Sequence, residues 1–178
     1  VPMKDKYTLL YNKVHHGTVL DVSPNGFDRS SVDFGSIFVD EDDPSTIFLF
    51  YSGTQNVQWS RSALGLAISN DAFTFQKISN DSILEGDSQS FNYKEAFTPA
   101  VTRVGDRFYM VFSGRASSKE SRRIGIAYAD DPKGPWHIIG EILKPTCLWE
   151  GVHLDNGPTL VKLDETTFLV FYSSITTP

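Results

Sequence analysis

Two aspartates occupy matching places in a repeated sequence pattern, and they are the first candidates for chemistry. Asp33 and Asp155 each lie three residues before the aligned start of a repeat unit, Ser36 and Pro158 respectively. Two carboxylates that face one channel could divide the roles of general acid and general base between them. An aspartate ahead of a glycine also commonly caps a turn, because its carboxylate accepts hydrogen bonds from nearby backbone amides. The sequence leaves both interpretations open.

The loop before the second aspartate combines an aromatic ring, a carboxylate and an imidazole, in Trp149, Glu150 and His153. Sugars pack their C–H faces on aromatic rings, and their hydroxyls form hydrogen bonds with carboxylates and imidazoles. The loop therefore indicates a saccharide subsite to which Trp149 and His153 contribute. The alternative is that Trp149 fills a gap between sheets while Glu150 lies in water.

Two arginines, Arg61 and Arg115, lie in loops between expected strands. A guanidinium there could bind a carboxylate or a phosphate, or it could brace its own loop. The sequence contains no HExxH motif, no glycine-rich phosphate loop and no Gly-x-Ser-x-Gly elbow. No metal and no cofactor are therefore expected.

The composition excludes several classes of partner. Sixteen Lys and Arg against 22 Asp and Glu give a net charge of −6, which disfavours binding to nucleic acid or to an anionic membrane. The single cysteine, Cys147, excludes an intrachain disulfide and a cysteine-based zinc site. No run of about 18 apolar residues could span a bilayer. The compartment stays open between the cytoplasm and export after removal of a signal.

The chain is expected to be all-β, because its aromatic and branched residues form short apolar runs separated by Gly, Asp, Asn, Ser and Pro. No stretch shows the 3.6-residue apolar period of a helix. The expected strands are 36–39, 47–51, 63–69, 74–78, 100–104, 108–113, 124–129, 136–142, 159–163 and 168–173. Gly105 and Asp106 are expected to form a tight hairpin turn.

These strands repeat with a period of about sixty residues. The sequence 34–53 matches 97–114, and both match 156–173, with Ser36, Pro99 and Pro158 aligned at spacings of 63 and 59 residues. Four strands in each such unit are typical of a blade of a β-propeller. The expected blades are approximately 33–80, 97–143 and 156–178, within a single propeller domain that occupies 1–178.

The third unit stops after two strands, so the chain holds about two and a half to three blades, fewer than the four to eight of a closed ring. Either the chain is a fragment whose other blades come from elsewhere, or the segment from Tyr7 to Asp21 adds strands. A partial propeller would expose an unpaired edge and an apolar face. Self-association, or another chain that supplies the missing blades, is therefore expected.

Several segments carry a resemblance to a known group of enzymes. They are Gly26-Phe27-Asp28, 32–36, Phe50-Tyr51-Ser52-Gly53, 64–71 and Phe73-Thr74-Phe75. In this order, and with their recurrence in the second unit, they resemble the five-bladed β-propeller glycosidases of glycoside hydrolase families 43, 32 and 130. The resemblance spans about residues 26 to 174.

The resemblance implies a sugar site at one end of the channel, with carboxylates at the start of the innermost strand of successive blades. Family 43 uses an aspartate base, a second aspartate that modulates pKa, and a glutamate acid. Asp33 matches the base, and Glu95 is the carboxylate nearest to the second position. Asn156 stands where the family has its glutamate acid, and an amide cannot donate a catalytic proton. Asp155 is adjacent to it and Glu150 lies upstream.

The favoured function is cleavage of a glycosidic bond in an oligo- or polysaccharide, with Asp33 as the base and an acid drawn from Glu150 or Asp155, near Glu95. An inverting hydrolase would hold its two carboxyl groups about 6.5–9.5 Å apart. Asn156 leaves open the alternative that the protein is a non-catalytic carbohydrate-binding module. The short length of the chain leaves open a structural or partner-binding fragment of a propeller. Phosphorolysis of glycosides is the third alternative, to which Arg61 and Arg115 would contribute.

Overall fold

The computed structural model describes residues 17–56, 61–164 and 166–175 and confirms the all-β prediction. Its helical content in these ranges is one short 3-10 turn, η1 (Leu148–Glu150). The strands are β1 (Ser31–Val39), β2 (Ile47–Thr54), β3 (Ser62–Ser69), β4 (Gln76–Lys77), β5 (Glu95–Val104), β6 (Arg107–Arg115), β7 (Arg123–Ala129), β8 (His137–Leu143), β9 (His153–Lys162) and β10 (Phe168–Ile175).

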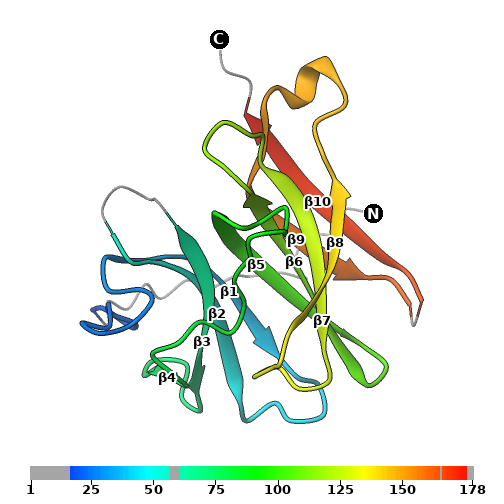
Figure 1. Cartoon of the computed structure of the whole chain (residues 1–178). Helices are drawn as coiled ribbons and strands as arrows, with labels where there is room; N and C mark the ends of the chain where they lie inside the picture. The colour runs from blue at the N-terminus through cyan, green and yellow to red at the C-terminus, as the bar shows by residue number, and fades with distance from the viewer. Residues whose placement is uncertain (1–16, 57–60, 165, 176–178) are drawn as a thin grey trace, which may run out of the picture.

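The strands form three antiparallel units in chain order (Figure 1). β1 to β4 make the first unit, β5 to β8 the second, and β9 with β10 a two-stranded third. A single parallel pair, Ser62 with Glu95, joins the first two units at the beginning of β3 and β5. This succession of four-stranded meanders is the blade pattern of a β-propeller, and its third unit has two strands in the described part of the chain.

The hydrophobic core lies between neighbouring units. Phe50 and Leu64 of the first unit share one buried cluster with Met110 and Phe112 of the second, and the Phe50 ring meets the Trp136 ring edge-on at 5.9 Å. A second cluster joins the second unit to the third through Val111, Ile124, Ile126 and Leu154. Each unit therefore depends on its neighbour to bury its faces.

The first strand of each unit begins earlier than predicted and contains a bulge. The bulges lie between Asp33 and Ser36, between Phe97 and Ala100, and opposite Phe171 to Ser173 in β9. Each contains one residue of positive φ: Phe34 at 39°, Thr98 at 51° and Gly157 at 85°. The polar and glycine residues of these bulges resemble loop sequence, which explains the late predicted starts.

The register corrects the predicted alignment of the first two units by one residue. Ser36 pairs with Phe50, and Ala100 pairs with Val111, so Ser36 is equivalent to Ala100 rather than to Pro99. The repeat between the first strands of these units is therefore 64 residues. The hairpin predicted at Gly105 is confirmed, with the glycine at a φ of 59° between β5 and β6.

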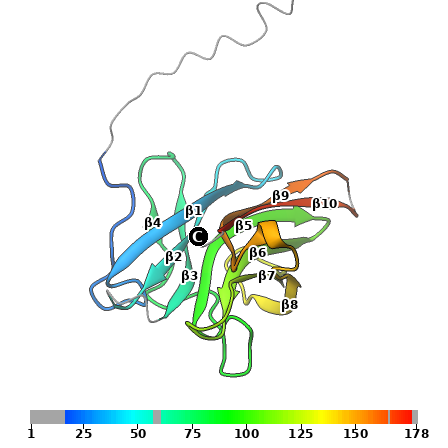
Figure 2. The ribbon, with the colours of Figure 1, turned by 90° about the horizontal axis from the view of Figure 1, so that it is seen from above.

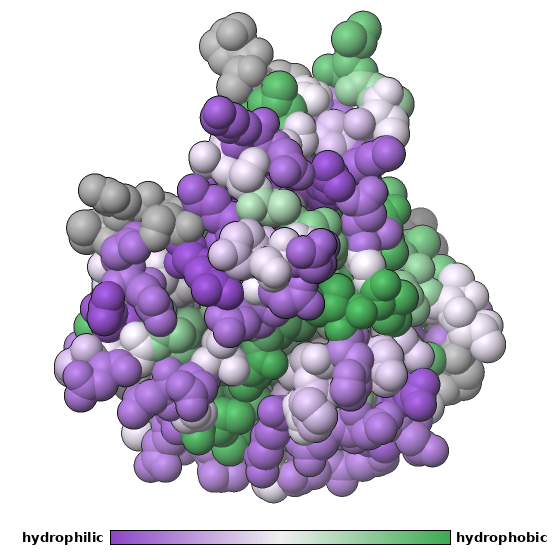
Figure 3. Space-filling view, in the orientation of Figure 1, coloured by the Kyte–Doolittle hydropathy of each residue, from purple (hydrophilic) through white to green (hydrophobic). Residues whose placement is uncertain are grey.

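Most of the segment expected to add strands, Tyr7 to Asp21, lies outside the described residues, and residues 17–21 contain no strand. Among the described residues there is no helix with the length and apolar character needed to cross a membrane. The face shown in Figure 3 is largely hydrophilic, with hydrophobic surface at the top, where the η1 loop protrudes. Leu148 in that loop is fully exposed and Trp149 is 61% exposed.

Candidate active site

The first strands of the three units lie next to one another and form a common centre. β5 contacts both β1 and β9, and Figure 2 shows the three strands side by side when the molecule is seen from above. Because β1, β5 and β9 hold equivalent places in their units, their beginnings lie at the same end of this centre. Asp33, Glu95 and the backbone of Asp155 lie near these beginnings.

The ladder register gives Asp33 and Asp155 equivalent backbone positions. Asp33 pairs with Ser52, and Asp155 pairs with Ser173. Each of these serines follows an aromatic residue in the second strand of its unit. In the second unit the corresponding pair is Phe97 with Ser113, so an aromatic ring takes the place of a carboxylate there.

The Asp33 carboxylate is half-buried, and its Oδ2 atom is buried without a hydrogen-bond partner. No described residue donates a hydrogen bond to either of its oxygens, so the predicted alternative of a turn cap has no counterpart in the geometry. A carboxylate oxygen withheld from both water and protein donors costs free energy. Such uncompensated groups are typical of functional sites, where a ligand or a reacting water supplies the partner.

An aromatic pair lies directly beside Asp33. The Phe34 ring is 53% exposed and lies 5.0 Å from the Phe97 ring between centroids. Phe34 also adopts a positive φ of 39°, which is strained for a residue with a large side chain. The sequence argument missed both rings as site residues. Both rings lie in the repeated bulge but at successive positions of it, because Phe97 is equivalent to Asp33 and Phe34 to Thr98.

One hydrogen bond between the first two units, and one within each of them, hold this geometry. The Ser52 hydroxyl accepts a hydrogen bond from the Thr98 backbone N–H at 2.9 Å, and it lies 3.5 Å from the Phe34 carbonyl oxygen, to which it donates. The Thr98 hydroxyl donates to Ser113 Oγ at 3.1 Å. The repeated serines therefore tie the bulged strands together directly below Asp33 and Phe97.

Glu95 is bound on both oxygens by arginines. Arg115 Nη2 lies 2.5 Å from Oε1, and Arg122 Nε lies 2.7 Å from Oε2. The glutamate side chain is only 5% exposed, and the Arg122 guanidinium also lies over the Phe97 ring at 5.8 Å. Arg115, expected to contact substrate, therefore binds Glu95 within the protein.

His153 is connected to the same cluster through the backbone. Its Nδ1 atom accepts a hydrogen bond from the Arg122 N–H at 3.0 Å. A neutral His153 therefore carries its proton on Nε2. The imidazole is thereby oriented by the residue whose side chain binds Glu95, which keeps His153 at the predicted site.

Glu150 is buried and holds its own loop together. Its carboxylate accepts hydrogen bonds from the Thr146 and Cys147 backbone amides at 2.5 and 2.8 Å, and from the Tyr172 hydroxyl at 2.8 Å. These bonds, led by those from the Thr146 and Cys147 amides, lower the pKa of Glu150 to about 2. A group ionised at neutral pH cannot deliver a proton to a leaving oxygen, so the geometry assigns Glu150 to structure rather than to the expected acid role.

We predict that this carboxylate contributes stability that acid removes. Its pKa is lower in the folded chain than the ordinary 4.5, so the contribution is complete above about pH 4.5 and is lost as the pH falls towards 2. Glu150→Gln should have a thermal midpoint a few degrees below that of the wild type at pH 7. Thermal unfolding followed by circular dichroism from pH 7 to 2 should show this gap closing with acid.

Asp71 supplies the control for that experiment. Hydrogen bonds from the Thr74 and Phe73 amides lower its pKa to about 2 as well, but it lies in the turn after β3, away from the η1 loop. Asp71→Asn should show the same closing gap and leave the Glu150 effect unchanged. A gap between Glu150→Gln and the wild type that stays constant with pH would contradict the assignment.

Trp149 and Arg61 lie towards the rim. The Trp149 ring stacks on Tyr172 with centroids 6.0 Å apart and planes at 25°. Arg61 donates to the Gly86 carbonyl oxygen at 3.1 Å and lies 5.3 Å above the Tyr93 ring. A small hollow of about 210 Å³ adjoins it, lined by Arg61, Tyr93, Lys94, Ala116, Ser117 and Ser118.

The backbones of Asp155 and Asn156 belong to β9, but their side chains fall outside the described part of the structure. Their predicted roles as acid and substrate-binding residue therefore stay predictions. Within the described ranges no group of three His, Cys, Asp or Glu side chains could hold a metal ion.

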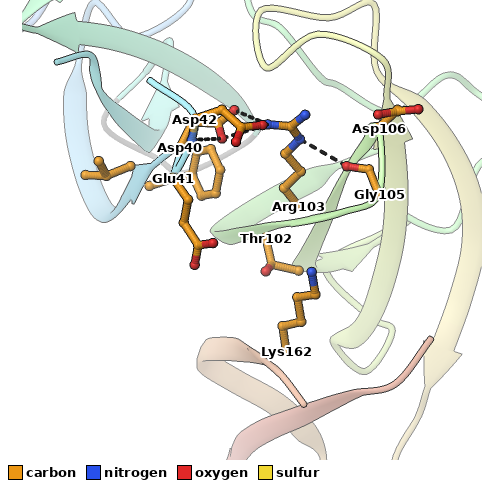
Figure 4. Close-up of a pocket in the computed structure, with 10 residues that line it drawn as sticks. Asp40, Glu41, Asp42, Thr102, Arg103, Gly105, Asp106 and Lys162 are labelled. Carbon is orange, nitrogen blue, oxygen red and sulfur yellow. Dashed lines mark hydrogen bonds and ion pairs between the residues drawn. The ribbon is translucent and has the colours of Figure 1, made fainter. Parts of the chain in front are cut away.

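A pocket of about 420 Å³ lies at the other end of the inner strands (Figure 4). Its wall includes Asp40 and Asp42, which bind the Arg103 guanidinium at 2.8 and 2.6 Å. This ion pair connects the β1–β2 hairpin to the β5–β6 hairpin. It therefore fastens two units together at the end remote from Asp33. The lining as a whole stays acidic, with carboxylates in excess over Arg103 and Lys162.

The blade pattern and the carboxylates at one end of the inner strands define the protein as a partial β-propeller of the glycosidase type. Residues 36–177 match the family model of glycosyl hydrolases family 43. This match covers most of the sequence, and the chain therefore belongs to glycosyl hydrolases family 43.

Solved structures share this fold at low sequence identity. A family 117 glycoside hydrolase from Zobellia galactanivorans superposes with a TM-score of 0.65 at 12% identity, over 86% of this chain and 51% of its own. The GH43_1 enzyme from Xanthomonas citri, complexed with xylotriose, gives 0.60 at 14% identity, over 81% and 40%. A family 32 β-fructofuranosidase from Bombyx mori gives 0.59 at 22% identity, over 84% and 30%.

The chain thus spans between about a third and a half of the length of these three structures. The predicted class of five-bladed propeller glycosidases is confirmed by the family match and by these folds. A comparison with curated protein sequences gave no match.

Proposed function

We propose that the protein hydrolyses a glycosidic bond of an oligo- or polysaccharide, with Asp33 as the general base. The observation that carries this proposal is the buried Asp33 Oδ2 atom, which lacks any hydrogen-bond partner at the site end of β1. The other two described carboxylates near this end, Glu95 and Glu150, have both oxygens bonded to arginines or to backbone and tyrosine donors. Of these three carboxylates, Asp33 alone has no described donor on its oxygens, which is why it is the proposed base.

The proposed acid is Asp155, because its backbone holds the position in β9 that Asp33 holds in β1. In the reaction Asp33 takes a proton from the attacking water, whose oxygen bonds to the anomeric carbon. The bond from that carbon to the leaving oxygen breaks, and the acid protonates the leaving oxygen. Glu95 and its two arginines hold Phe97 and His153 in place beside this centre.

The proposed substrate-binding groups are Phe34 and Phe97 for the apolar face of a sugar, with His153 and Asn156 for its hydroxyls. Arg61 remains a candidate at the rim. We favour hydrolysis over phosphorolysis, because the Arg115 guanidinium that a phosphate would require already binds Glu95. Binding without turnover is the second candidate, and the amide of Asn156 in place of a carboxyl favours it.

The proposal also concerns how the ring of propeller blades is closed. We propose that blades at about 33–80, 97–143 and 156–178 are completed by further blades, supplied by a longer form of this chain, by another copy or by another chain. The supporting observations are the two-stranded third unit and the exposed apolar residues of β10, Leu169 and Phe171 at 43 and 58%.

The function is tested by incubating the chain with xylotriose, sucrose and a panel of arabino-oligosaccharides and separating the products by anion-exchange chromatography. The first two follow the ligand of the Xanthomonas relative and the bond type in the name of the Bombyx relative. Release of shorter sugars supports hydrolysis. Saturable binding with no product would support the binding module, and phosphate-dependent release of a sugar phosphate would support phosphorolysis.

We expect Phe34→Ala to weaken sugar binding and leave the fold intact. Its exposed ring offers a stacking surface whose loss should raise the Kd for the sugar about fivefold, which corresponds to an aromatic contact of about 1 kcal/mol. Calorimetric titration with the sugar that the panel identifies measures the change. Phe73→Ala, which removes a ring of the same 53% exposure in the turn after β3, is the matched control and should leave binding unchanged. Equal affinity of the wild type and Phe34→Ala would remove Phe34 from the site.

A further inference from the structure

The hollow of about 210 Å³ beside the beginnings of β3 and β5 is lined by basic, aromatic and hydroxyl side chains. Arg61 and Lys94 supply two positive charges, Tyr93 supplies a ring, and Ser117 and Ser118 supply hydroxyls. None of the described lining residues is acidic. This contrasts with the net charge of −6 of the chain and with the acidic pocket at the other end of the inner strands. The hollow therefore favours anions.

Backbone hydrogen bonds place the hollow beside the candidate active site. The Lys94 carbonyl oxygen accepts a hydrogen bond from the Ser62 N–H at 3.1 Å, and the Lys94 N–H donates to the Arg115 carbonyl oxygen at 3.1 Å. Lys94 thus lies where the first two units meet, directly before Glu95. Phe97 follows three residues later, about 10 Å along an extended strand. A sugar in the hollow and a sugar against Phe97 would therefore be near neighbours in one oligosaccharide.

The Arg61 guanidinium is oriented by the protein but only weakly paired. It lies 5.3 Å above the Tyr93 ring, and its Nη2 donates to the Gly86 carbonyl oxygen at 3.1 Å. Its carboxylate partner among the described residues, Glu85, lies 3.5 Å away, and the two side chains are 44 and 55% exposed. Exposed ion pairs of this kind contribute little free energy. The oxyanion of a ligand can therefore replace Glu85 at little cost.

The other lining groups suit a sugar that carries the oxyanion. Lys94 is half-buried, and its ammonium group has neither a carboxylate nor another acceptor in the described part of the chain. Tyr93 is 43% exposed, so its ring keeps apolar surface against which the C–H face of a sugar can pack. The exposed Ser118 hydroxyl is available to sugar hydroxyls. The hollow is smaller than typical pockets for drug-sized ligands, and it suits a single sugar residue.

We propose that the hollow is a subsite for an acidic sugar residue of the substrate. Arg61 and Lys94 bind its oxyanion group, a uronic acid carboxylate or a sulfate ester, and Tyr93 packs against its ring. The planar guanidinium of Arg61 can present two parallel N–H groups to such an oxyanion, and Lys94 adds a point charge from the neighbouring unit. This assignment rests on the proposed function, because it places the subsite next to the hydrolysed bond. It narrows the substrate to an oligosaccharide with acidic residues or side groups.

Binding in the hollow is tested by NMR titration of the isotope-labelled full chain with methyl glucuronide, with its neutral methyl ester and with a sulfate ester of methyl glucoside. The glucuronide should shift the amide signals of Tyr93, Lys94 and Ser117. It should bind at least about fivefold more tightly than the methyl ester, which lacks the charge. Added NaCl should reduce this preference, because salt screens the two cations. The tighter ligand of the glucuronide and the sulfate ester identifies the source of the oxyanion.

Variants of the two cations test which groups bind the oxyanion. Lys94→Gln and Arg61→Gln should each lower the ratio of the affinities for the glucuronide and the methyl ester by about threefold. Lys119→Gln is the matched control, because Lys119 is an exposed lysine of the adjacent loop that does not line the hollow. It removes the same charge and should leave the ratio unchanged. The thermal midpoint of each variant shows whether it is folded.

Equal affinities for the glucuronide and the methyl ester, or shifts confined to other parts of the chain, would overturn the subsite. So would an equal loss of preference in Lys119→Gln, which would reduce the effect to the overall charge. Binding of inorganic phosphate that Lys94→Gln abolishes, without any preference for the acidic sugar, would assign the hollow to a free anion instead.

The binding measurements need no turnover, so the subsite and the proposed function can fail separately. Preferential binding of the glucuronide by a chain that cleaves no sugar would contradict Asp33 as the base and keep the subsite. Cleavage of neutral sugars by a chain with no preference for the glucuronide would contradict the subsite and keep the hydrolase.

Discussion

Asp33→Asn is expected to lower kcat/KM for the hydrolysed sugar by about 10²–10⁴-fold, the usual contribution of a general base. The amide has nearly the same shape as the carboxylate, but it cannot take a proton from the attacking water. Initial rates measured on the sugar that the substrate panel identifies give this ratio directly. Asp40→Asn, at the opposite end of β1, is the matched control and should retain the wild-type rate.

The thermal midpoint of Asp33→Asn separates a catalytic role of Asp33 from a structural one. The buried Oδ2 atom of Asp33 has no partner to lose, so the amide should leave the midpoint unchanged or raise it. An aspartate that capped a turn would instead lose stability on the same substitution. Full turnover with a lowered midpoint would therefore return Asp33 to a structural role and overturn the proposed base.

The positions of most strands follow from the sequence, because alternating and continuous apolar runs are long in β2, β3, β6 and β7. The beginnings of β1, β5 and β9 do not follow from the sequence. There the chain bulges through Phe34, Thr98 and Gly157, and a bulge removes the alternation on which the prediction depends. The site lies in these bulges, so sequence periodicity is least informative where the chemistry is expected.

The candidate residues divide in the same way. Asp33 can be proposed from the sequence, because its place in the repeat is visible there. The structural role of Glu150 is not visible in the sequence. It depends on Tyr172, whose hydroxyl donates a hydrogen bond to Glu150 from across the third unit. Three aromatic residues, Phe27, Phe91 and Trp149, each stack on an aromatic residue in the second strand of their own unit. The stacking geometry reveals this repeat, since the loops around the three residues share little sequence.

Glu95 provides the second large effect, on stability rather than on turnover. Glu95→Gln should lower the free energy of unfolding by about 3–5 kcal/mol, because the guanidinium groups of Arg115 and Arg122 would lose their buried counter-charge. Urea unfolding followed by circular dichroism measures the change. Glu141→Gln is the matched control, because Glu141 lies 2.5 Å from Arg123 but is 35% exposed, and its loss should cost less than about 1 kcal/mol.

Glu95→Gln also decides whether Glu95 takes part in catalysis. If it acts by holding Arg122, and through Arg122 also Phe97 and His153, turnover per folded molecule should fall by less than tenfold in conditions where the variant is folded. Glu95→Leu combined with Arg115→Met and Arg122→Met should regain much of the lost stability, since no buried charge is left unpaired. Loss of turnover comparable to that of Asp33→Asn, in a variant shown to be folded, would instead place Glu95 among the catalytic carboxylates.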